Sequence, residues 1–159
     1  MLIWNPSKLT TKGKALLAKA QAGKCTIKIT KAQTGSGQYS SEEATDTRTS
    51  LKTPVQTLPI HSKEIQNGST LVLKVAITNK TSDTDILKSG YEIREFGIFA
   101  QDPHDAEILH SIATASTSDY MPAYNGVIPS VISMSYYLEV ANASSVTIVT
   151  AGGLALQSD

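Results

Sequence analysis

Few side chains in this sequence are of the types that act as nucleophiles, general bases or metal ligands. The histidines are His61, His104 and His110, and the one cysteine is Cys25. No histidine belongs to an HExxH pair, and a single cysteine cannot build a zinc cluster. The densest group is Asp102-Pro103-His104-Asp105, which could hold a cation, but a tight turn directs such side chains apart. The residues predict no metal site and no cofactor.

A covalent or phosphate-binding mechanism has no better support. The sequence contains no Gly-x-Ser-x-Gly elbow, and no cysteine–histidine pair is suggested by position. Gly35-Ser36-Gly37 and Gly152-Gly153 lack the helix signals that follow a phosphate-binding loop. We therefore predict that the protein is not an enzyme.

Charged and aromatic residues in unusual settings are better candidates, and for binding rather than catalysis. Arg94 and Glu95 interrupt an apolar strand, and simple alternation places them on opposite faces. Either the charges belong to an in-domain ion pair or lie at a solvated edge, or one of the two pairs with a neighbouring subunit. Trp4 precedes Pro6 in an N-terminal arm, residues 1–8, and packs either on its own domain or into a partner. The candidate partner-binding residues are Trp4, Lys12, Lys19, Arg94, Glu95 and Tyr120.

Composition excludes several classes of partner. The 159 residues carry 14 basic and 14 acidic side chains, so no net charge draws the chain to nucleic acid or to a membrane surface. No apolar run approaches the roughly 20 residues of a membrane span, and the start of the chain is too short for a secretory signal. Cys25 can form no intrachain disulfide, as expected for synthesis in a reducing bacterial cytoplasm.

One helix is predicted near the N-terminus. Thr10 or Thr11 can cap it, and Gly23 can end it. Its apolar stripe consists of Leu9, Gly13, Leu16, Leu17 and Ala20. This spacing predicts a helix that covers one face of a sheet or docks directly on a partner.

After Gly23 the hydrophobic period changes from helical to two, which predicts strands. The predicted strands are 25–31, 71–78, 91–100, 107–114 and 132–140, with a partner strand at Val146 and Ile148 that follows a turn at 142–145. Residues 91–100 and 107–114 form a hairpin, and apolar residues on both faces near Phe96 indicate a central strand. Phe96, Phe99, Leu73, Val75, Leu109 and Leu138 are the predicted core.

Long polar connections occupy 34–57, 79–90 and 116–130, with a short helix near Glu42–Ser50. Such loops either become ordered against neighbours or pack over the sheet edges. The predicted fold class is α+β, mainly β: an antiparallel sheet or sandwich with an N-terminal helix and long polar loops. Residues 1–23 form the arm and helix, and residues 24–159 form one β-rich domain.

Four ordered blocks carry a family resemblance: 9–16 with 19–23, 34–37, 91–109, and 119–123 with 131–140. They resemble the N-terminal domain of bacteriophage tail-fibre (tail-collar) proteins. In the second block Ser36 stands where the family usually has the acid of a Gly-Asp-Gly turn, and the turn is longer.

The resemblance implies a structural component of a phage tail or a tail-like particle such as a contractile bacteriocin. Such domains form the particle-proximal end of a homotrimeric fibre and contact baseplate wedge proteins during host attachment. Because the sequence stops at Gln157-Ser158-Asp159, soon after this domain, we expect either a fragment of a longer fibre or a short adaptor. The alternative function is a carbohydrate-binding β-sandwich that recognises a host cell-surface glycan, with Tyr120, Tyr124 and Tyr137 as stacking platforms.

Overall fold

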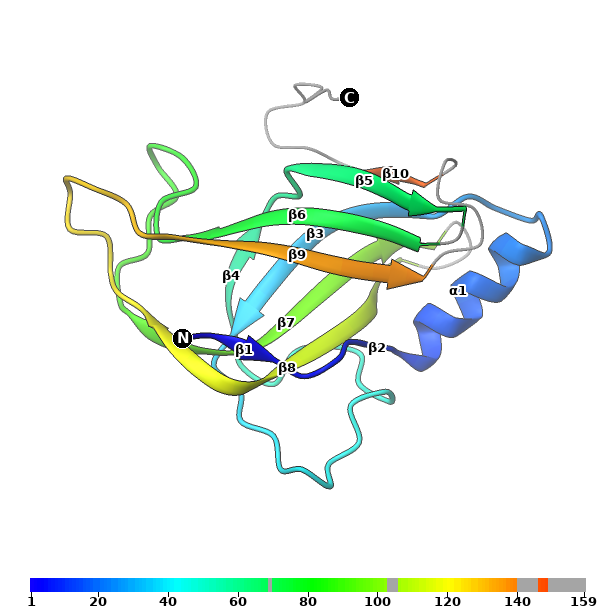
Figure 1. Ribbon diagram of the computed structural model, residues 1–159, viewed down its shortest axis with the longest axis horizontal. Coiled ribbons are helices and arrows are strands. Elements are labelled where there is room, and N and C mark those ends of the chain that lie inside the picture. The colour runs from blue at the N-terminus through cyan, green and yellow to red at the C-terminus, as the bar shows by residue number, and fades with distance from the viewer. Residues whose placement is uncertain (69, 103–105, 140–145, 149–159) are drawn as a thin grey trace.

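The computed structural model describes the chain except for residue 69 and residues 103–105, 140–145 and 149–159 (Figure 1). The described residues form one helix and ten strands. These are β1 (Ile3–Trp4), β2 (Lys8–Leu9), α1 (Thr11–Gln21), β3 (Lys28–Gly35), β4 (Pro54–Leu58), β5 (Ser62–Asn67), β6 (Thr70–Thr78), β7 (Tyr91–Gln101), β8 (Glu107–Met121), β9 (Val131–Glu139) and β10 (Thr147–Ile148). The predicted mainly-β class with an N-terminal helix is confirmed.

The larger sheet has seven strands in the order β1-β8-β7-β3-β10, with β2 also on β8 and β4 on β3. Its centre is the hairpin of β7 and β8, as the sequence predicts. From Phe96 to Ala100 every β7 residue is buried, which confirms a strand covered on both faces.

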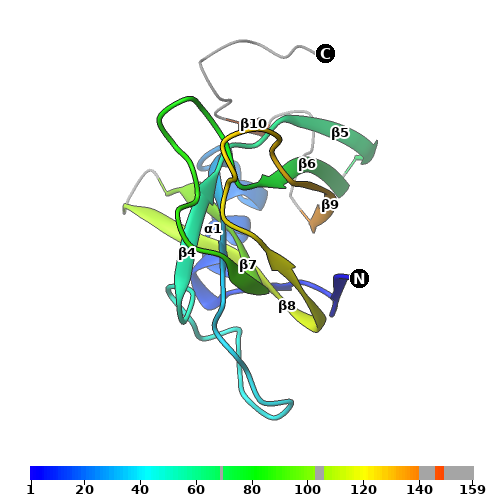
Figure 2. The ribbon, with the colours of Figure 1, turned by 90° about the vertical axis from the view of Figure 1, so that its left-hand side faces the viewer.

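The smaller sheet, β5-β6-β9, packs over the larger one (Figure 2). Residues of both sheets form one core, in which the ring of Phe96 lies 5.1 Å from the ring of Tyr136. The hydroxyl of Tyr136, on β9, donates a hydrogen bond to Ser111 Oγ of β8 at 2.9 Å. Five of the six predicted core residues are at most 2% exposed, and the sixth, Phe99, is 9% exposed.

Helix α1 begins where the sequence predicts. Thr10 is its N-cap, and Thr10 Oγ1 accepts a hydrogen bond from the Gly13 amide at 3.0 Å. The same hydroxyl donates to the Leu109 carbonyl of β8, so the cap also fastens the helix to the sheet. Gly23 follows the helix with a φ of +75°, a left-handed conformation that glycine adopts readily.

Four predictions about local structure are wrong or displaced. Strand β3 starts at Lys28 rather than residue 25. Residues 42–50 form turns and bends rather than a helix, and residues 116–121 extend β8 rather than forming a loop. The last strand, β10, runs parallel to β3 in the larger sheet instead of pairing with β9. An alternating apolar pattern identifies the buried face of a strand but not its neighbour, which explains the last error.

The predicted turn at 142–145 and most of the turn at 102–105 lie outside the described residues. In the described part of the chain no helix is long and apolar enough to cross a membrane.

Candidate functional site

Glu95 holds a long loop against the sheet. Its side chain is fully buried, and its carboxylate accepts hydrogen bonds from the backbone amides of Gly37, Lys52 and Thr53 at 2.8–2.9 Å. The Tyr39 hydroxyl donates at 2.5 Å to Oε1, the oxygen that also accepts from the Lys52 amide. Burying a carboxylate is costly unless it is hydrogen-bonded, and these four donors provide that compensation. Because the donors come from both ends of residues 36–53, one side chain fixes the whole loop.

Two glycines make room for this carboxylate. A Cβ atom added at Gly35 or at Gly37 would lie 2.5 Å from Glu95 Oε2, closer than real side chains approach. The second resemblance block therefore has a local structural role here: its glycines allow the loop backbone to approach the buried acid.

Arg94 and Glu95 point to the same side of the sheet, which corrects the prediction of opposite faces. Ile93 and Phe96 both lie in the core between the sheets, so the alternation slips by one residue between them. The pairing register shifts at this point. A bulge redirects side chains in this way, and both charged residues consequently contact loop 36–53.

The bulge is much wider in β8 than in β7. Ile93 lies opposite Asp119, and Glu95 lies opposite Thr114. Residues 115–118 of β8 therefore lie opposite a single residue of β7, Arg94. On its other side, this stretch of β8 pairs with β1. The β7–β8 ladder is therefore interrupted at Arg94.

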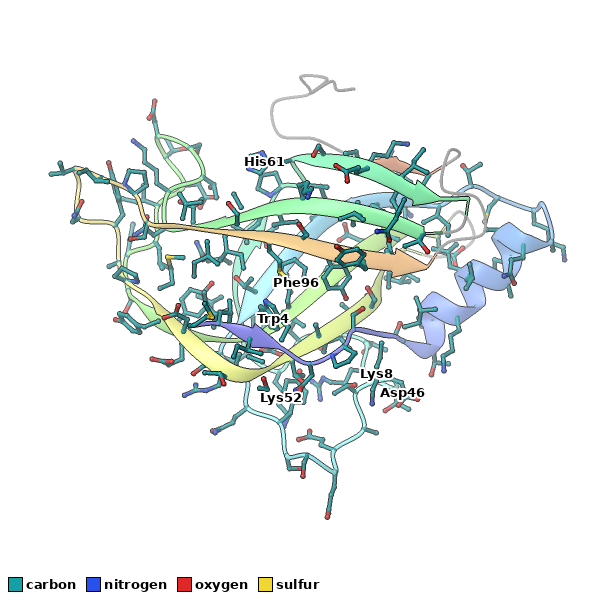
Figure 3. All side chains as sticks on the ribbon, viewed as in Figure 1. Trp4, Lys8, Asp46, Lys52, His61 and Phe96 are labelled. Atoms are coloured by element: carbon teal, nitrogen blue, oxygen red, sulfur yellow. The ribbon has the colours of Figure 1, made fainter. Side chains whose placement is uncertain are left out.

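A cavity of about 610 Å³ lies between loop 36–53 and the interrupted part of β8, and we call it the Arg94 groove. Its lining includes Lys8, Gln38, Tyr39, Arg94, Thr114 and Ser116. The loop extends below β2 and β8 in Figure 1 (cyan), and Lys8 lies on that side of β2 in Figure 3. The site is thus built by four separate segments of the chain: the N-terminal arm with β2, loop 36–53, β7 and β8.

The two cations of the groove have no carboxylate partner among the described residues. Arg94 Nη1 donates to the Ser36 carbonyl at 3.3 Å, and Lys8 is exposed. The carboxylate of Glu43, also in the lining, is bound by Lys52 Nζ at 2.7 Å. That hydrogen bond, assisted by the Ser40 amide, lowers the pKa of Glu43. The charge left to act on a ligand is positive.

The aromatic ring of Tyr39 is already occupied. Lys52 Nζ lies 4.5 Å and the Arg48 guanidinium 5.7 Å from the ring centroid. Burial, and then the hydrogen bond to Glu95, raise the pKa of the hydroxyl, which keeps it a donor to the carboxylate. The groove can therefore bind through charge and hydrogen bonds, whereas its aromatic residue is engaged within the loop.

The family model for the phage tail-collar fibre protein, N-terminal, matches residues 6–159. The chain belongs to this family. It is therefore a structural, non-enzymatic tail component. No curated protein and no solved structure shows a match.

Within this tail-collar fibre domain, Trp4 lies against its own core. Its ring contacts the Phe96 ring edge-on, with the ring centroids 5.9 Å apart (Figure 3). Strand β1, which contains Trp4, pairs with β8. The sequence left open whether the N-terminal arm packs on its own domain or on a partner. In the structure, strand β1 of the arm is part of the larger sheet. Its alternative role at a partner remains a prediction.

The other predicted partner-binding residues are dispersed over the tail-collar domain. Lys19 Nζ forms an ion pair with Asp102 at 2.9 Å, joining α1 to the end of β7. Lys12 is exposed on α1, and Tyr120 is 53% exposed near the end of β8. Of the six, the structure brings together only Arg94 and Glu95.

Sequence reasoning missed an exposed aliphatic tip, which we define as Val127 and Ile128. Their side chains are 75% and 70% exposed. Both backbone amides donate to Asn125 Oδ1, at 2.8 and 3.0 Å, so the tip has a defined shape. The Asn-Gly pair at 125–126 signals a turn, but nothing in the pattern indicated that the apolar residues after it face solvent.

Asn79 braces the base of this tip. Its side-chain amide donates to the Pro122 carbonyl at 3.0 Å, and its Oδ1 accepts from the Ser130 amide at 2.9 Å. The two loops at this end of the domain, 79–90 and 122–130, are thereby fixed to each other (Figure 1).

Among the described residues no group of three or more histidine, cysteine, aspartate or glutamate side chains could hold a metal. His104 and Asp105 of the predicted turn lie outside that part of the chain. His110 is fully buried beside the cap of α1, and neither ring nitrogen has a described hydrogen-bond partner.

Proposed function

We propose that the protein attaches a tail fibre to the baseplate of a contractile phage tail or tail-like particle and is held there in three copies. The observation that carries this proposal is the family match over residues 6–159, which includes α1, loop 36–53 and every strand of the two sheets except β1. The location that follows is the virion or tail-like particle, and the proposed partners are baseplate wedge proteins.

Geometry supports a connector rather than a flexible tether. Loop 36–53 is fastened by Glu95, and the two loops at the aliphatic tip are fastened by Asn79. Surfaces that are ordered before binding lose less conformational entropy on association. An exposed pair of adjacent aliphatic side chains on such a frame suits a protein contact.

Particle incorporation tests the attachment. The double variant Val127→Asp and Ile128→Asp places charges on the tip without touching the core, and Ile65→Asp on β5, 51% exposed in the native chain, is the matched control. We expect the control to appear in purified particles at the wild-type level and the tip variant to be depleted. A wild-type protein absent from the baseplate in electron micrographs of assembled particles would contradict the proposal.

The threefold state is tested separately. Homo-oligomers close by symmetry, and a threefold axis suits a fibre. We expect three copies per attachment point in particle reconstructions. A protein that is monomeric by light scattering and also present as single copies in the particle would refute this part.

The same wild-type protein should be offered to purified host cell walls. Retention on cell wall with no retention on baseplate proteins would favour the glycan-binding alternative. Tyr120 and Tyr137, 53% and 56% exposed, are the tyrosines whose substitution would then abolish binding.

A further inference from the structure

We propose that the Arg94 groove binds an extended acidic peptide segment of another particle protein, with a side-chain carboxylate held by Arg94. This inference deepens the proposed connector function, because it names the chemistry of a contact between this domain and its neighbour. It is carried by the charge, the interrupted ladder and the shape of the groove.

The first step is the state of Arg94. The bulge turns this half-buried side chain toward the groove, where it makes one hydrogen bond to the part of the chain that the structure describes, and its acceptor is a neutral carbonyl. A guanidinium carries five N–H donors in a planar fork that matches a carboxylate. Because a partly buried charge without a counter-charge is unfavourable, an incoming carboxylate would relieve that cost as well as form new bonds. Lys8, in the same lining, adds a second positive charge.

The second step is the backbone beside Arg94. Residues 115–118 have no pairing partners in β7, although the strands pair on both sides of this stretch. An extended peptide segment can form hydrogen bonds with backbone N–H and C=O groups that the neighbouring strand leaves unpaired. The surrounding lining supplies hydroxyl and amide groups, including Asn5, Ser40 and Ser118, which suit peptide hydrogen bonds.

The third step is size and selectivity. A volume of about 610 Å³ is far larger than one carboxylate or phosphate needs and lies in the range of sites for drug-sized ligands. A sugar ring would seek an aromatic face, but Lys52 and Arg48 cover Tyr39. An acidic peptide uses both the volume and the charge.

The fourth step is preorganisation. Glu95 fixes the loop wall through amides at both loop ends, while Arg94, the preceding residue in the chain, reaches the groove. Of the two charged residues at the bulge, Glu95 thus holds the loop wall in place and Arg94 supplies the positive charge for the ligand.

The test uses overlapping ten-residue synthetic peptides from the other structural proteins of the particle that contains this chain. Each acidic peptide is paired with an analogue in which Asp and Glu are replaced by Asn and Gln. Binding to the whole protein is measured by fluorescence polarisation at low salt. We expect at least one acidic peptide to bind, its neutral analogue to bind about tenfold to a hundredfold more weakly, and Arg94→Gln to cause a similar loss.

Matched variants locate the effect. Arg94→Lys should restore part of the affinity, Lys8→Gln should weaken binding a few-fold, and Lys24→Gln, an exposed lysine after α1, should leave it unchanged. The inference is overturned if no peptide binds in a charge-dependent way or if Arg94→Gln binds as the wild type does. It is also overturned if inorganic phosphate at the peptide's concentration competes as well as the peptide, because the site would then be a simple anion site.

The inference and the proposed function fail in different ways. If wild-type protein occupies the baseplate and Arg94→Gln is incorporated equally, without loss of peptide affinity, only the inference fails. If the peptides bind through Arg94 but the wild-type protein is located away from the baseplate, only the proposed attachment fails.

Discussion

The carboxylate of Glu95 and the hydroxyl of Tyr39 are joined by a 2.5 Å hydrogen bond between strand β7 and the loop that crosses it. With the backbone amides of Gly37, Lys52 and Thr53, this contact makes Glu95 the anchor of loop 36–53. The domain therefore uses a buried acid to shape a surface loop, and the groove beside that loop depends on it.

We predict that Glu95→Gln destabilises the domain by about 2–3 kcal/mol, because an amide nitrogen would face backbone donors that now meet a carboxylate. Loop 36–53 should also become accessible to trypsin at Arg48. Urea unfolding measures the loss of stability, and timed proteolysis measures cleavage of the loop. Glu42→Gln, an exposed acid in the same loop, is the control and should change neither. Equal stability and equal cleavage of the two variants would show that Glu95 is not the anchor.

Much of the frame could be predicted because it rests on periodic burial. The alternation of β6 and β9, the cap of α1 and the apolar run around Phe96 each follow from local spacing. The site could not be predicted, because it depends on a break in alternation between Ile93 and Phe96. A break in alternation and a three-residue shift in pairing register leave no signature in residue types, so Glu95 could be identified as unusual but not as the partner of a loop 42–58 residues away in sequence.

The extension of β8 over residues 116–121 could not be predicted from local sequence either. Ser116 and its neighbours carry the small polar residues of a loop, and they became strand because β1 pairs with them from the far end of the sequence. Contacts of this length are set by tertiary packing rather than by local propensity.

Trp4 gives a second prediction, because its ring packs edge-on against the fully buried Phe96. Phe96→Ala should cost about 3–5 kcal/mol in stability. In a double-mutant cycle, Trp4→Ala should couple to Phe96→Ala by about 0.5–1.5 kcal/mol, the range for aromatic pairs. Deleting residues 1–8 should consequently lower the melting temperature. A deletion variant as stable as the wild type but absent from particles would instead make the segment a docking arm.

Gly13 provides a third prediction that opposes helix propensity. Alanine is normally favoured over glycine inside a helix by about 1 kcal/mol. Here a Cβ atom at residue 13 would overlap the carbonyl oxygen of His110 on β8. We expect Gly13→Ala to destabilise the domain by about 1–3 kcal/mol through overpacking. The exposed Ala15→Gly, which loses only propensity, should cost about 0.5–1 kcal/mol. A stabilised Gly13→Ala protein would mean that α1 does not pack this closely on β8.

His110 gives the last prediction, which concerns acid. Burial lowers the pKa of its imidazole from 6.5 to about 4, and both ring nitrogens lack described partners. Above pH 6.5 the residue is neutral in both the folded and the unfolded states, so its contribution is constant. Between pH 6.5 and 4 the unfolded chain binds a proton that the folded protein does not, so stability falls as the pH falls. Below about pH 4 the folded state is protonated too, and this contribution reaches its limit.

The expected loss through that window is about 3 kcal/mol, at about 1.4 kcal/mol for each pH unit of pKa difference. His110→Leu removes the titrating group, so its unfolding free energy should depend less on pH between 6.5 and 4 than that of the wild type. Urea denaturation at half-unit pH steps measures the difference, and titrating carboxylates common to both proteins largely cancel in it. His61→Gln, a change at an exposed histidine, should leave the wild-type slope intact. If the His110→Leu curve instead runs parallel to the wild-type curve, the buried imidazole does not titrate as its surroundings indicate.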